Sequence, residues 1–416
     1  MDFLSETYTD IRQFLLSAAR WAWGLPDPLT IEFLPRTYDE NGVQPRKRWI
    51  KLILRSSRST WHLKLTFQGT ITDDRHPIFG KKPKRRKDLQ DLCHCIDFHR
   101  VQLLDDTVTE VILALDPVKE SVRLPYEKRP GRDNEFFSVI DQLWVYTRED
   151  PDRVRFPTFN SNRSIPTREL SDIRSKEELD GHSVYKVLLH SDETPYIYKE
   201  IERPHYIPAD TEVLEQELYN LELFRGNTFG IVQLIAAVVS QNPYQTTPST
   251  KKKSPGVLYG VLLEYHPNGT LEDALKMREP QINGRWCQWA VQIASALFEM
   301  HRRGITHMDL KPANVVITAN FDAVLIDVSG IGGVTREWLS PEMRGNENPF
   351  SKSIEERKQN DIWALGRIMM AMADAYACSD DEKQKLRSVA QAATRSPPRI
   401  PLGHVIAALS ERPSTP

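Results

Sequence analysis

Residues 305–317 read ITHMDLKPANVVI and carry more chemistry than any other stretch of the chain. Apolar residues lead into the polar loop HMDLKPAN, and a β-branched run follows that predicts a buried strand. The next apolar run, AVLID, ends at Asp327, thirteen residues after Asn314. A strand hairpin of that length would return Asp327 to the side of Asn314. Because Mg²⁺ prefers carboxylate and amide oxygens, this pair predicts a magnesium site.

Several ordered motifs in this half of the chain resemble those of the eukaryotic protein kinases. HMDLKPAN resembles the catalytic loop HRDLKxxN, DVSG resembles the metal-binding DFG, SPE resembles APE, and DIWALG resembles DxWxxG. The likeness covers about 250 of the 416 residues. It implies an α+β, bilobal domain with a small β-rich lobe and a larger helical lobe. It also implies transfer of a phosphoryl group from Mg-ATP to a protein substrate.

The resemblance assigns a role to the polar residues of these motifs. Asp309 would accept the proton of the substrate hydroxyl, and Lys311 would neutralise the transferred phosphoryl group. Asn314 and Asp327 would hold the metal ion. Lys199, in the alternating stretch YIYKEI, stands where the family has its nucleotide-binding lysine.

A carboxylate is expected to pair with this lysine. Residues 210–224, DTEVLEQELYNLELF, show the apolar spacing of a helix, and Glu217 falls among the residues of its apolar face. A buried carboxylate without a cation is costly, so we expect Glu217 to pair with Lys199.

The adenine side of the site is less regular. VLLEYHPNGTLEDAL resembles a kinase hinge, with Leu263 as gatekeeper and the backbone of Glu264 to His266 facing adenine. ELDGHSVYKV stands at the glycine-rich loop but keeps only Gly181. Two registers remain open: either Val187 or Val184 closes over adenine.

Later landmarks concern the activation segment. Thr335 stands seven residues before Glu342, where Ser/Thr kinases place a threonine that ties this segment to the catalytic aspartate and lysine. With the loop lysine, it favours serine or threonine as the substrate residue. Asp361 opens DIWALG, which is expected to start a long buried helix, and Arg399 could pair with Glu342, with Arg395 as a rival.

Departures from the family pattern support a second hypothesis. Met308 replaces an arginine that in many kinases binds an activation-loop phosphate, and Val328 and Ser329 replace the Phe and Gly of DFG. These changes and the reduced glycine loop fit a pseudokinase that serves as an interaction scaffold. A small-molecule kinase is a third reading, since only 50 residues follow DIWALG.

The first 165 residues are predicted to form a separate, unassigned α+β region. A helix is expected at 11–25, strands at 29–34, 49–54, 61–67 and 108–115, a linker at 151–167, and a mobile surface loop at 241–256. The kinase-like domain would then span residues 168–416.

The charge pattern of the sequence indicates which classes of partner to expect. Residues 45–87 hold 14 Lys/Arg against two Asp, which could attract an acidic partner, although nucleic acid is not the favoured one. KKPKRRK at 81–87 is read as a solvated loop, with nuclear import as the alternative.

Four cysteines predict free thiols, and no apolar run reaches the ~18 residues that cross a bilayer. We therefore expect an intracellular protein, cytoplasmic or nuclear.

Overall fold

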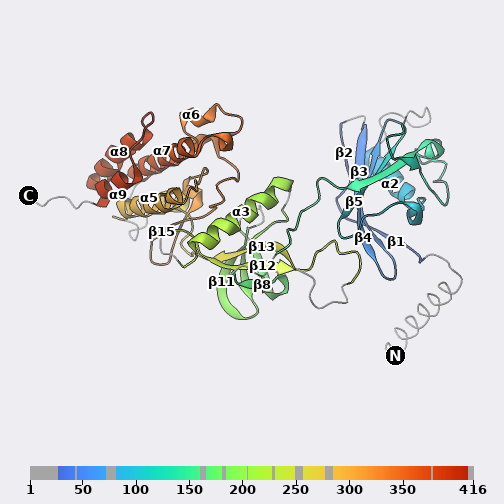
Figure 1. Cartoon of the computed structure of the whole chain (residues 1–416), viewed down its shortest axis with the longest axis horizontal. Coiled ribbons are helices and arrows are strands. Elements are labelled where there is room, and N and C mark those ends of the chain that lie inside the picture. The colour runs from blue at the N-terminus through green and yellow to red at the C-terminus, as the bar shows by residue number, and fades with distance from the viewer. Residues whose placement is uncertain are drawn as a thin grey trace, which may run out of the picture. The chain divides into compact units, whose positions relative to one another are not determined.

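The chain folds into two compact units in the computed structural model (Figure 1). Unit 1 comprises residues 1–153 and 241–254, and unit 2 comprises residues 154–240 and 255–416. The structure describes residues 27–42, 45–71, 81–159, 165–179, 184–203, 205–226, 230–248, 256–276, 284–375 and 378–410. The helix predicted at 11–25 lies outside these ranges.

Unit 1 is built on a mixed sheet with the strand order β1-β3-β4-β5-β7-β6, and β2 pairs with β3. The parallel pair β4 and β5 is joined through helix α2, the long connection that parallel strands require. All four predicted strands are confirmed. The elements are β1 Thr30–Phe33, β2 Asp39–Glu40, β3 Lys47–Arg55, β4 Thr60–Gln68, α2 Lys82–Cys93, β5 Val108–Ala114, β6 Val122–Arg123 and β7 Trp144–Glu149, with 3-10 turns at Phe98–Arg100 and Ile140–Gln142.

The two faces of this sheet differ because side chains alternate along each strand. Leu52 and Leu63 on neighbouring strands face α2 and pack in one core with Leu89 and Leu92 of that helix. On the opposite face, Lys64 is buried at only 2% exposure. The sheet therefore has one apolar face and one face with buried charge.

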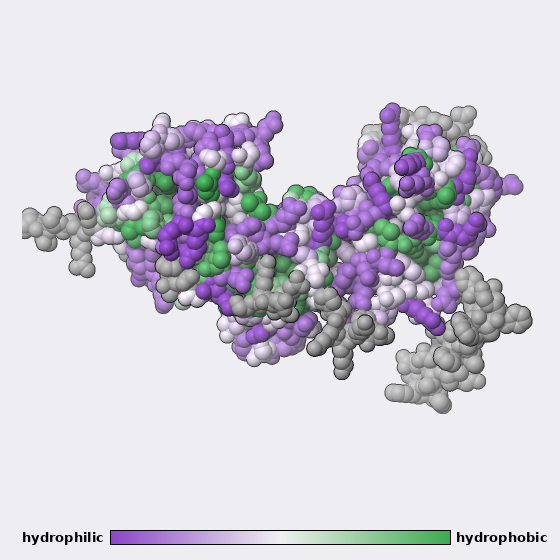
Figure 2. Space-filling view, viewed as in Figure 1, coloured by the Kyte–Doolittle hydropathy of each residue, from purple (hydrophilic) through white to green (hydrophobic). Residues whose placement is uncertain are grey.

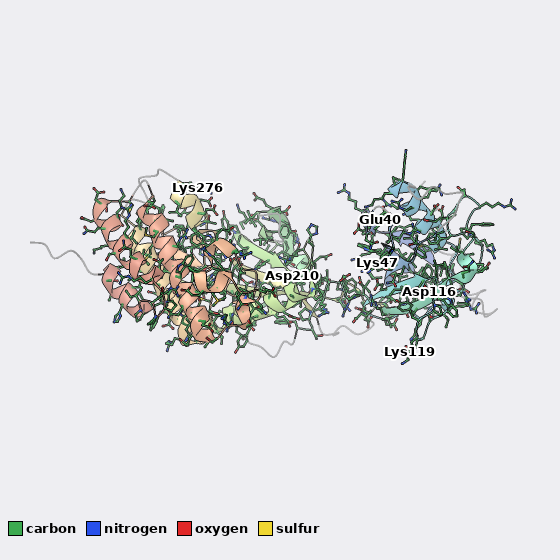
Figure 3. All side chains as sticks on the ribbon, turned by 90° about the horizontal axis from the view of Figure 1, so that it is seen from above. Glu40, Lys47, Asp116, Lys119, Asp210 and Lys276 are labelled. Carbon is green, nitrogen blue, oxygen red and sulfur yellow. The ribbon has the colours of Figure 1, made fainter. Side chains whose placement is uncertain are left out.

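The basic run at 81–87 is largely the first part of α2, so its interpretation as a solvated loop is wrong. Arg85 forms an ion pair of 2.5 Å with Glu40, which is labelled in Figure 3, and Lys84 pairs with Asp88 one turn along the helix. Glu40, 45 residues away from Arg85, is a partner that the local sequence does not show.

Residues 241–248 belong to unit 1 although they connect two strands of unit 2; they form a loop, as predicted, and hydrogen bonds anchor this loop to unit 1. The amide N–H of Thr60 donates to the carbonyl of Thr246 (2.8 Å), and the amide of Thr246 donates to the Asp106 carboxylate (2.9 Å). Asn242 donates to the carbonyl of Asp106 (2.9 Å). These hydrogen bonds replace the water that a surface loop would bind.

The small lobe of unit 2 is a sheet with the order β8-β12-β13-β11-β10-β9, in which only the pair β12–β8 is parallel among the described strands. Helix α3 packs its predicted apolar face into the core. Its first turn is capped by Asp210, labelled in Figure 3, whose carboxylate accepts from the amide of Ile207 (2.8 Å). The elements are β8 Thr167–Glu169, β9 Ile173–Glu178, β10 Val184–Leu189, β11 Asp192–Glu200, α3 Pro208–Phe224, β12 Leu234–Ser240 and β13 Val257–Glu264, with a 3-10 turn at Leu170–Asp172.

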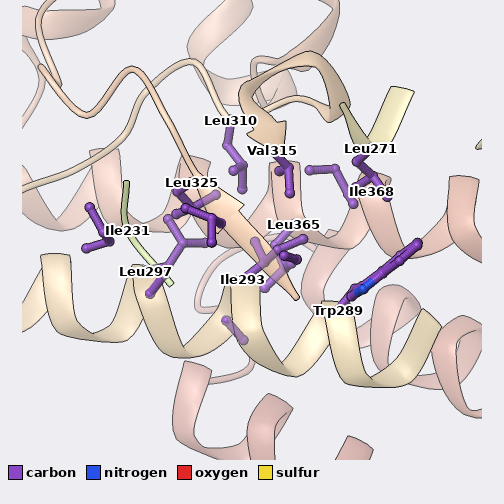
Figure 4. Close-up of a cluster of buried hydrophobic side chains, with 14 of the residues drawn as sticks. Ile231, Leu271, Trp289, Ile293, Leu297, Leu310, Val315, Leu325, Leu365 and Ile368 are labelled. Carbon is purple, nitrogen blue, oxygen red and sulfur yellow. The ribbon is translucent and has the colours of Figure 1, made fainter. Parts of the chain in front are cut away.

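The larger lobe is helical and contains the short antiparallel hairpin β14–β15. Figure 4 shows its core, in which Trp289, Ile293 and Leu297 of α5 meet Val315 and Leu325 of the hairpin. The elements are α4 Leu271–Lys276, α5 Trp286–Arg302, β14 Val315–Ile317, β15 Ala323–Leu325, α6 Pro341–Arg344, α7 Ile354–Ala373, α8 Asp380–Thr394 and α9 Leu402–Ser410, with 3-10 turns at Pro312–Asn314, Arg336–Trp338 and Pro349–Ser351.

Helix α7 begins seven residues before the position expected from DIWALG. The hydroxyl of Ser353 accepts from the amide of Glu356, and the Glu356 carboxylate accepts from the Ser353 amide, which is a capping box. Asp361 therefore lies two turns inside the helix rather than at its start.

Hydrophilic residues are common on the described surface. Figure 2 shows hydrophilic residues over much of the visible face of each unit. None of the described helices combines the length and the apolar character that crossing a bilayer requires. All four cysteines are free, as predicted.

Candidate active site

Three charged side chains from three elements meet at the centre of unit 2. The ammonium of Lys199 on β11 lies 2.6 Å from a carboxylate oxygen of Glu217 on α3. The same ammonium lies 2.7 Å from a carboxylate oxygen of Asp327, which follows β15. The predicted pairing of Lys199 with Glu217 is therefore present, and Asp327 joins it from a position 128 residues away.

The electrostatics of this triad follow from burial and from the single cation. Burial opposes a charge on Lys199, but the two carboxylates outweigh it and raise the pKa of the ammonium. The ammonium of Lys199 lowers the pKa of Asp327, whose side chain is 47% exposed. Glu217 is fully buried, and this burial raises the pKa of its carboxyl group. Lys199 and Asp327 are thus held in their charged forms.

A second polar cluster surrounds the carboxylate of Asp309. The ammonium of Lys311 lies 2.8 Å from one carboxylate oxygen of Asp309 and 2.8 Å from the hydroxyl of Thr335. The amide N–H of Thr335 donates to the other oxygen (2.7 Å), and the side-chain amide of Asn314 donates to the carboxylate (3.1 Å) and to the Asp309 carbonyl (2.8 Å). The structure therefore brings together the predicted catalytic-loop residues and Thr335.

Helix α7 holds this loop in place. The buried carboxylate of Asp361 accepts from the backbone amides of His307 (2.8 Å) and Met308 (2.9 Å). It also contacts the ring of His301 at 2.8 Å, a partner that the sequence motifs did not point to. Met308 has a positive φ of 66°, which costs a non-glycine residue energy, so the loop needs this support.

The oxygen atoms of Asn314 and Asp327 are suited to a divalent cation. The carbonyl of Asn314 accepts from the amide of Ile326, which places Asp327 next to Asn314 across the hairpin, as predicted. Because the Asn314 amide nitrogen is directed to Asp309, its oxygen is left to act as a ligand. This donor set fits the hard cation that accompanies a nucleotide.

The sheet face decides between the two registers of the glycine loop. Val184 pairs directly with Lys199 across β10 and β11, so the two side chains share one face. Val187 lies three residues on and points to the other face, where it is buried with Tyr198. Val187 as a residue over adenine is therefore wrong, because strand alternation turns it away. Gly181 lies outside the described residues.

Leu263 of the predicted hinge lies on the same face of the sheet as Lys199. Leu263 lies opposite Ile197, two residues along the strand from Lys199, and is buried in the main core of unit 2. Glu264 is anchored at the end of β13, because its side chain accepts from the amide of Gln233 (2.9 Å) and lies 3.1 Å from the ring of His266.

An ion pair anchors Glu342, which lies at the end of the predicted activation segment. Arg399, 5% exposed, donates to both carboxylate oxygens of Glu342 at 3.0 and 2.8 Å. The rival Arg395 lies on the exposed surface. Glu342 is thus tied to the chain between α8 and α9.

Comparison with known proteins agrees with this geometry. The protein kinase domain family matches residues 180–401, which is more than half of the chain. This chain belongs to the protein kinase family.

Known relatives are distant. The chain is 33% identical over 129 residues to mitogen-activated protein kinase kinase kinase 17 of Arabidopsis thaliana, covering 30% of this chain and 34% of that protein. It is 30% identical over 137 residues to the Aurora kinase of Eremothecium gossypii (30% and 35%) and 29% identical over 139 residues to serine/threonine-protein kinase cds1 of Schizosaccharomyces pombe (30% and 30%). The matches thus cover about a third of the length of these relatives.

Proposed function

We propose that this kinase domain transfers the γ-phosphoryl group of Mg-ATP to a serine or threonine hydroxyl of a protein substrate. The observation that carries the proposal is the triad Lys199–Glu217–Asp327, with contacts of 2.6 and 2.7 Å. A scaffold would gain little from it, because burying these charges costs desolvation energy that apolar packing avoids.

In this proposal the residues around Lys199 and Asp327 bind the nucleotide and the metal ion, and the residues around Asp309 act on the substrate hydroxyl and the transferred group. Lys199 binds the nucleotide phosphates, and Asn314 and Asp327 hold the metal ion, which neutralises charge on the phosphates. The substrate hydroxyl loses its proton to Asp309 as its oxygen bonds to the γ-phosphorus and the bond to the bridging oxygen of ADP breaks. Lys311, held by Thr335 and Asp309, stabilises the transferred group.

The test is phosphate transfer from Mg-ATP to a mixed peptide pool by the full chain and by Asp309→Asn. Asparagine keeps the shape but removes the base, so we expect transfer to fall by about 10²-fold or more. Asp380→Asn, at a fully exposed position at the start of α8, is the matched control and should keep wild-type activity.

Equal and negligible transfer by all three proteins would overturn the proposal and favour the scaffold. Transfer to metabolites but not to peptides would assign a small-molecule kinase. Phosphoamino-acid analysis of the product would test the preference for serine and threonine that Lys311 and Thr335 support.

A further inference from the structure

Asn220 is a buried polar residue on α3 that the kinase motifs do not include. It lies three residues after Glu217, close to one turn along the same helix, and is only 1% exposed. A side-chain amide at such a position must find hydrogen-bond partners, because burying it without them is costly.

Its partners lie in the turn that carries the metal-binding carboxylate. The side-chain nitrogen of Asn220 donates to the carbonyl of Val328 (2.7 Å) and to the carbonyl of Ser329 (3.1 Å). Both residues directly follow Asp327, and both are buried, with 0% and 7% exposure. One amide group therefore binds two consecutive carbonyls of the DVSG turn.

The orientation of the Asn220 amide is fixed by its neighbours. Carbonyl oxygens only accept hydrogen bonds, so the NH₂ group must face them. The oxygen of Asn220 then accepts from the side-chain amide of Gln216, one turn earlier on α3, at 2.9 Å. The nitrogen and the oxygen of the Asn220 side chain therefore both have hydrogen-bond partners of the correct type.

We propose that Asn220 is a positioning residue that fastens the DVSG turn to helix α3, so that Glu217 and Asp327 are held on Lys199 together. The triad and the Asn220 bonds are two parallel links between α3 and the turn, one ionic and one neutral. Because the neutral link is built from the chain itself, the arrangement needs no phosphate on the activation segment. Met308 is consistent with this, since it lacks the guanidinium that would bind such a phosphate.

The proposal rests on the proposed function, and two variants test it. Asn220→Asp keeps the shape but sets a carboxylate against two carbonyls, and Asn220→Leu removes all hydrogen bonding at similar volume. We expect both to lower kcat/KM for ATP by about tenfold to a hundredfold, the effect of losing hydrogen bonds to buried groups. Asn134→Leu is the matched control: Asn134 is equally buried, at 3% exposure, but lies in unit 1, where it donates to the carbonyl of Asp88. It should leave kcat/KM unchanged.

A second measurement separates positioning from general stability and does not need activity. Amide hydrogen exchange at Val328 to Gly332 should be faster by about tenfold or more in both Asn220 variants, while exchange in α5 and α7 stays at the wild-type rate. Uniformly faster exchange across unit 2, or unchanged exchange at the turn, would overturn the proposal. If the wild type transfers no phosphate, the proposed function fails, and the exchange experiment still decides the role of Asn220.

Discussion

Gly330 is a residue at which the DVSG turn leaves no space for a side chain. Its φ is +71°, and a Cβ built there would lie 2.4 Å from the carbonyl oxygen of Thr306. Thr306 directly precedes His307, so the DVSG turn, which we propose holds the metal ion, and the start of the HMDLKPAN loop approach each other through backbone atoms. The two parts of the site are therefore coupled without any side chain at this point.

Gly330→Ala should lower the free energy of unfolding by about 2–3 kcal/mol and reduce phosphate transfer. The cost combines the left-handed backbone with displacement of the Thr306 carbonyl. Urea unfolding and the transfer assay would measure the two effects. Gly333→Ala is the control, because a Cβ there meets no described atom within 4 Å. Equal stability of the two variants would show that the turn can move.

Helix α7 is the element that positions the catalytic loop. Its buried Asp361 binds two consecutive backbone amides of the loop with its two oxygens. An aspartate can accept both bonds, whereas an asparagine has one acceptor oxygen and a nitrogen that would face an N–H group.

Asp361→Asn should therefore lower kcat by about tenfold to a hundredfold and leave nucleotide affinity within about twofold. The reason is that the Asp361 carboxylate contacts His301, His307 and Met308, whereas Lys199, which we assign to the nucleotide phosphates, lies on β11 and pairs with Glu217. Steady-state kinetics and nucleotide titration would separate the two quantities. Asp374→Asn, which changes an exposed ion pair with Arg387 next to the same helix, should change neither. A wild-type kcat for Asp361→Asn would contradict the assignment of α7.

At the scale of the whole molecule, the fold of unit 1 compensates part of the charge asymmetry of the sequence. Lys64 lies 2.9 Å from both Asp150 and Asp152, and Arg48 lies 2.9 Å from Glu135. Together with the pairs made by Lys84 and Arg85, these contacts use part of the excess positive charge of residues 45–87 inside the unit. An acidic partner for this segment remains a proposal, and it would have to bind the cations outside these pairs.

Lys64→Met should destabilise unit 1 by about 3–5 kcal/mol, because it leaves the buried carboxylate of Asp150 without its cation. Amide hydrogen exchange should rise in residues 45–71 and 108–153 and stay unchanged in unit 2. Lys119→Met is the control: Lys119, labelled in Figure 3, is 94% exposed, and its loss should cost within about 0.5 kcal/mol. Unchanged exchange in the Lys64 variant would show that Asp150 finds another partner.

Features that depend on the local order of residues could be predicted from the amino-acid sequence. The HMDLKPAN loop, the hairpin behind it and the apolar face of α3 each follow from residue spacing, because helices and strands repeat their side chains at fixed periods. The position of Glu217 on an apolar helix face predicted its pairing with Lys199, and the family resemblance predicted the contact of Thr335 with Lys311; both contacts are present.

Features that depend on partners far away in the sequence became visible in the folded chain. Strand pairing selected Val184 over Val187, and a capping box set the start of α7. Long-range hydrogen bonds fixed residues 241–248 in unit 1 and joined Asn220 to the DVSG turn, 108 residues away. The role of an asparagine in a helical stretch does not follow from its position in the sequence, because it depends on the carbonyl groups that the fold places next to its side chain.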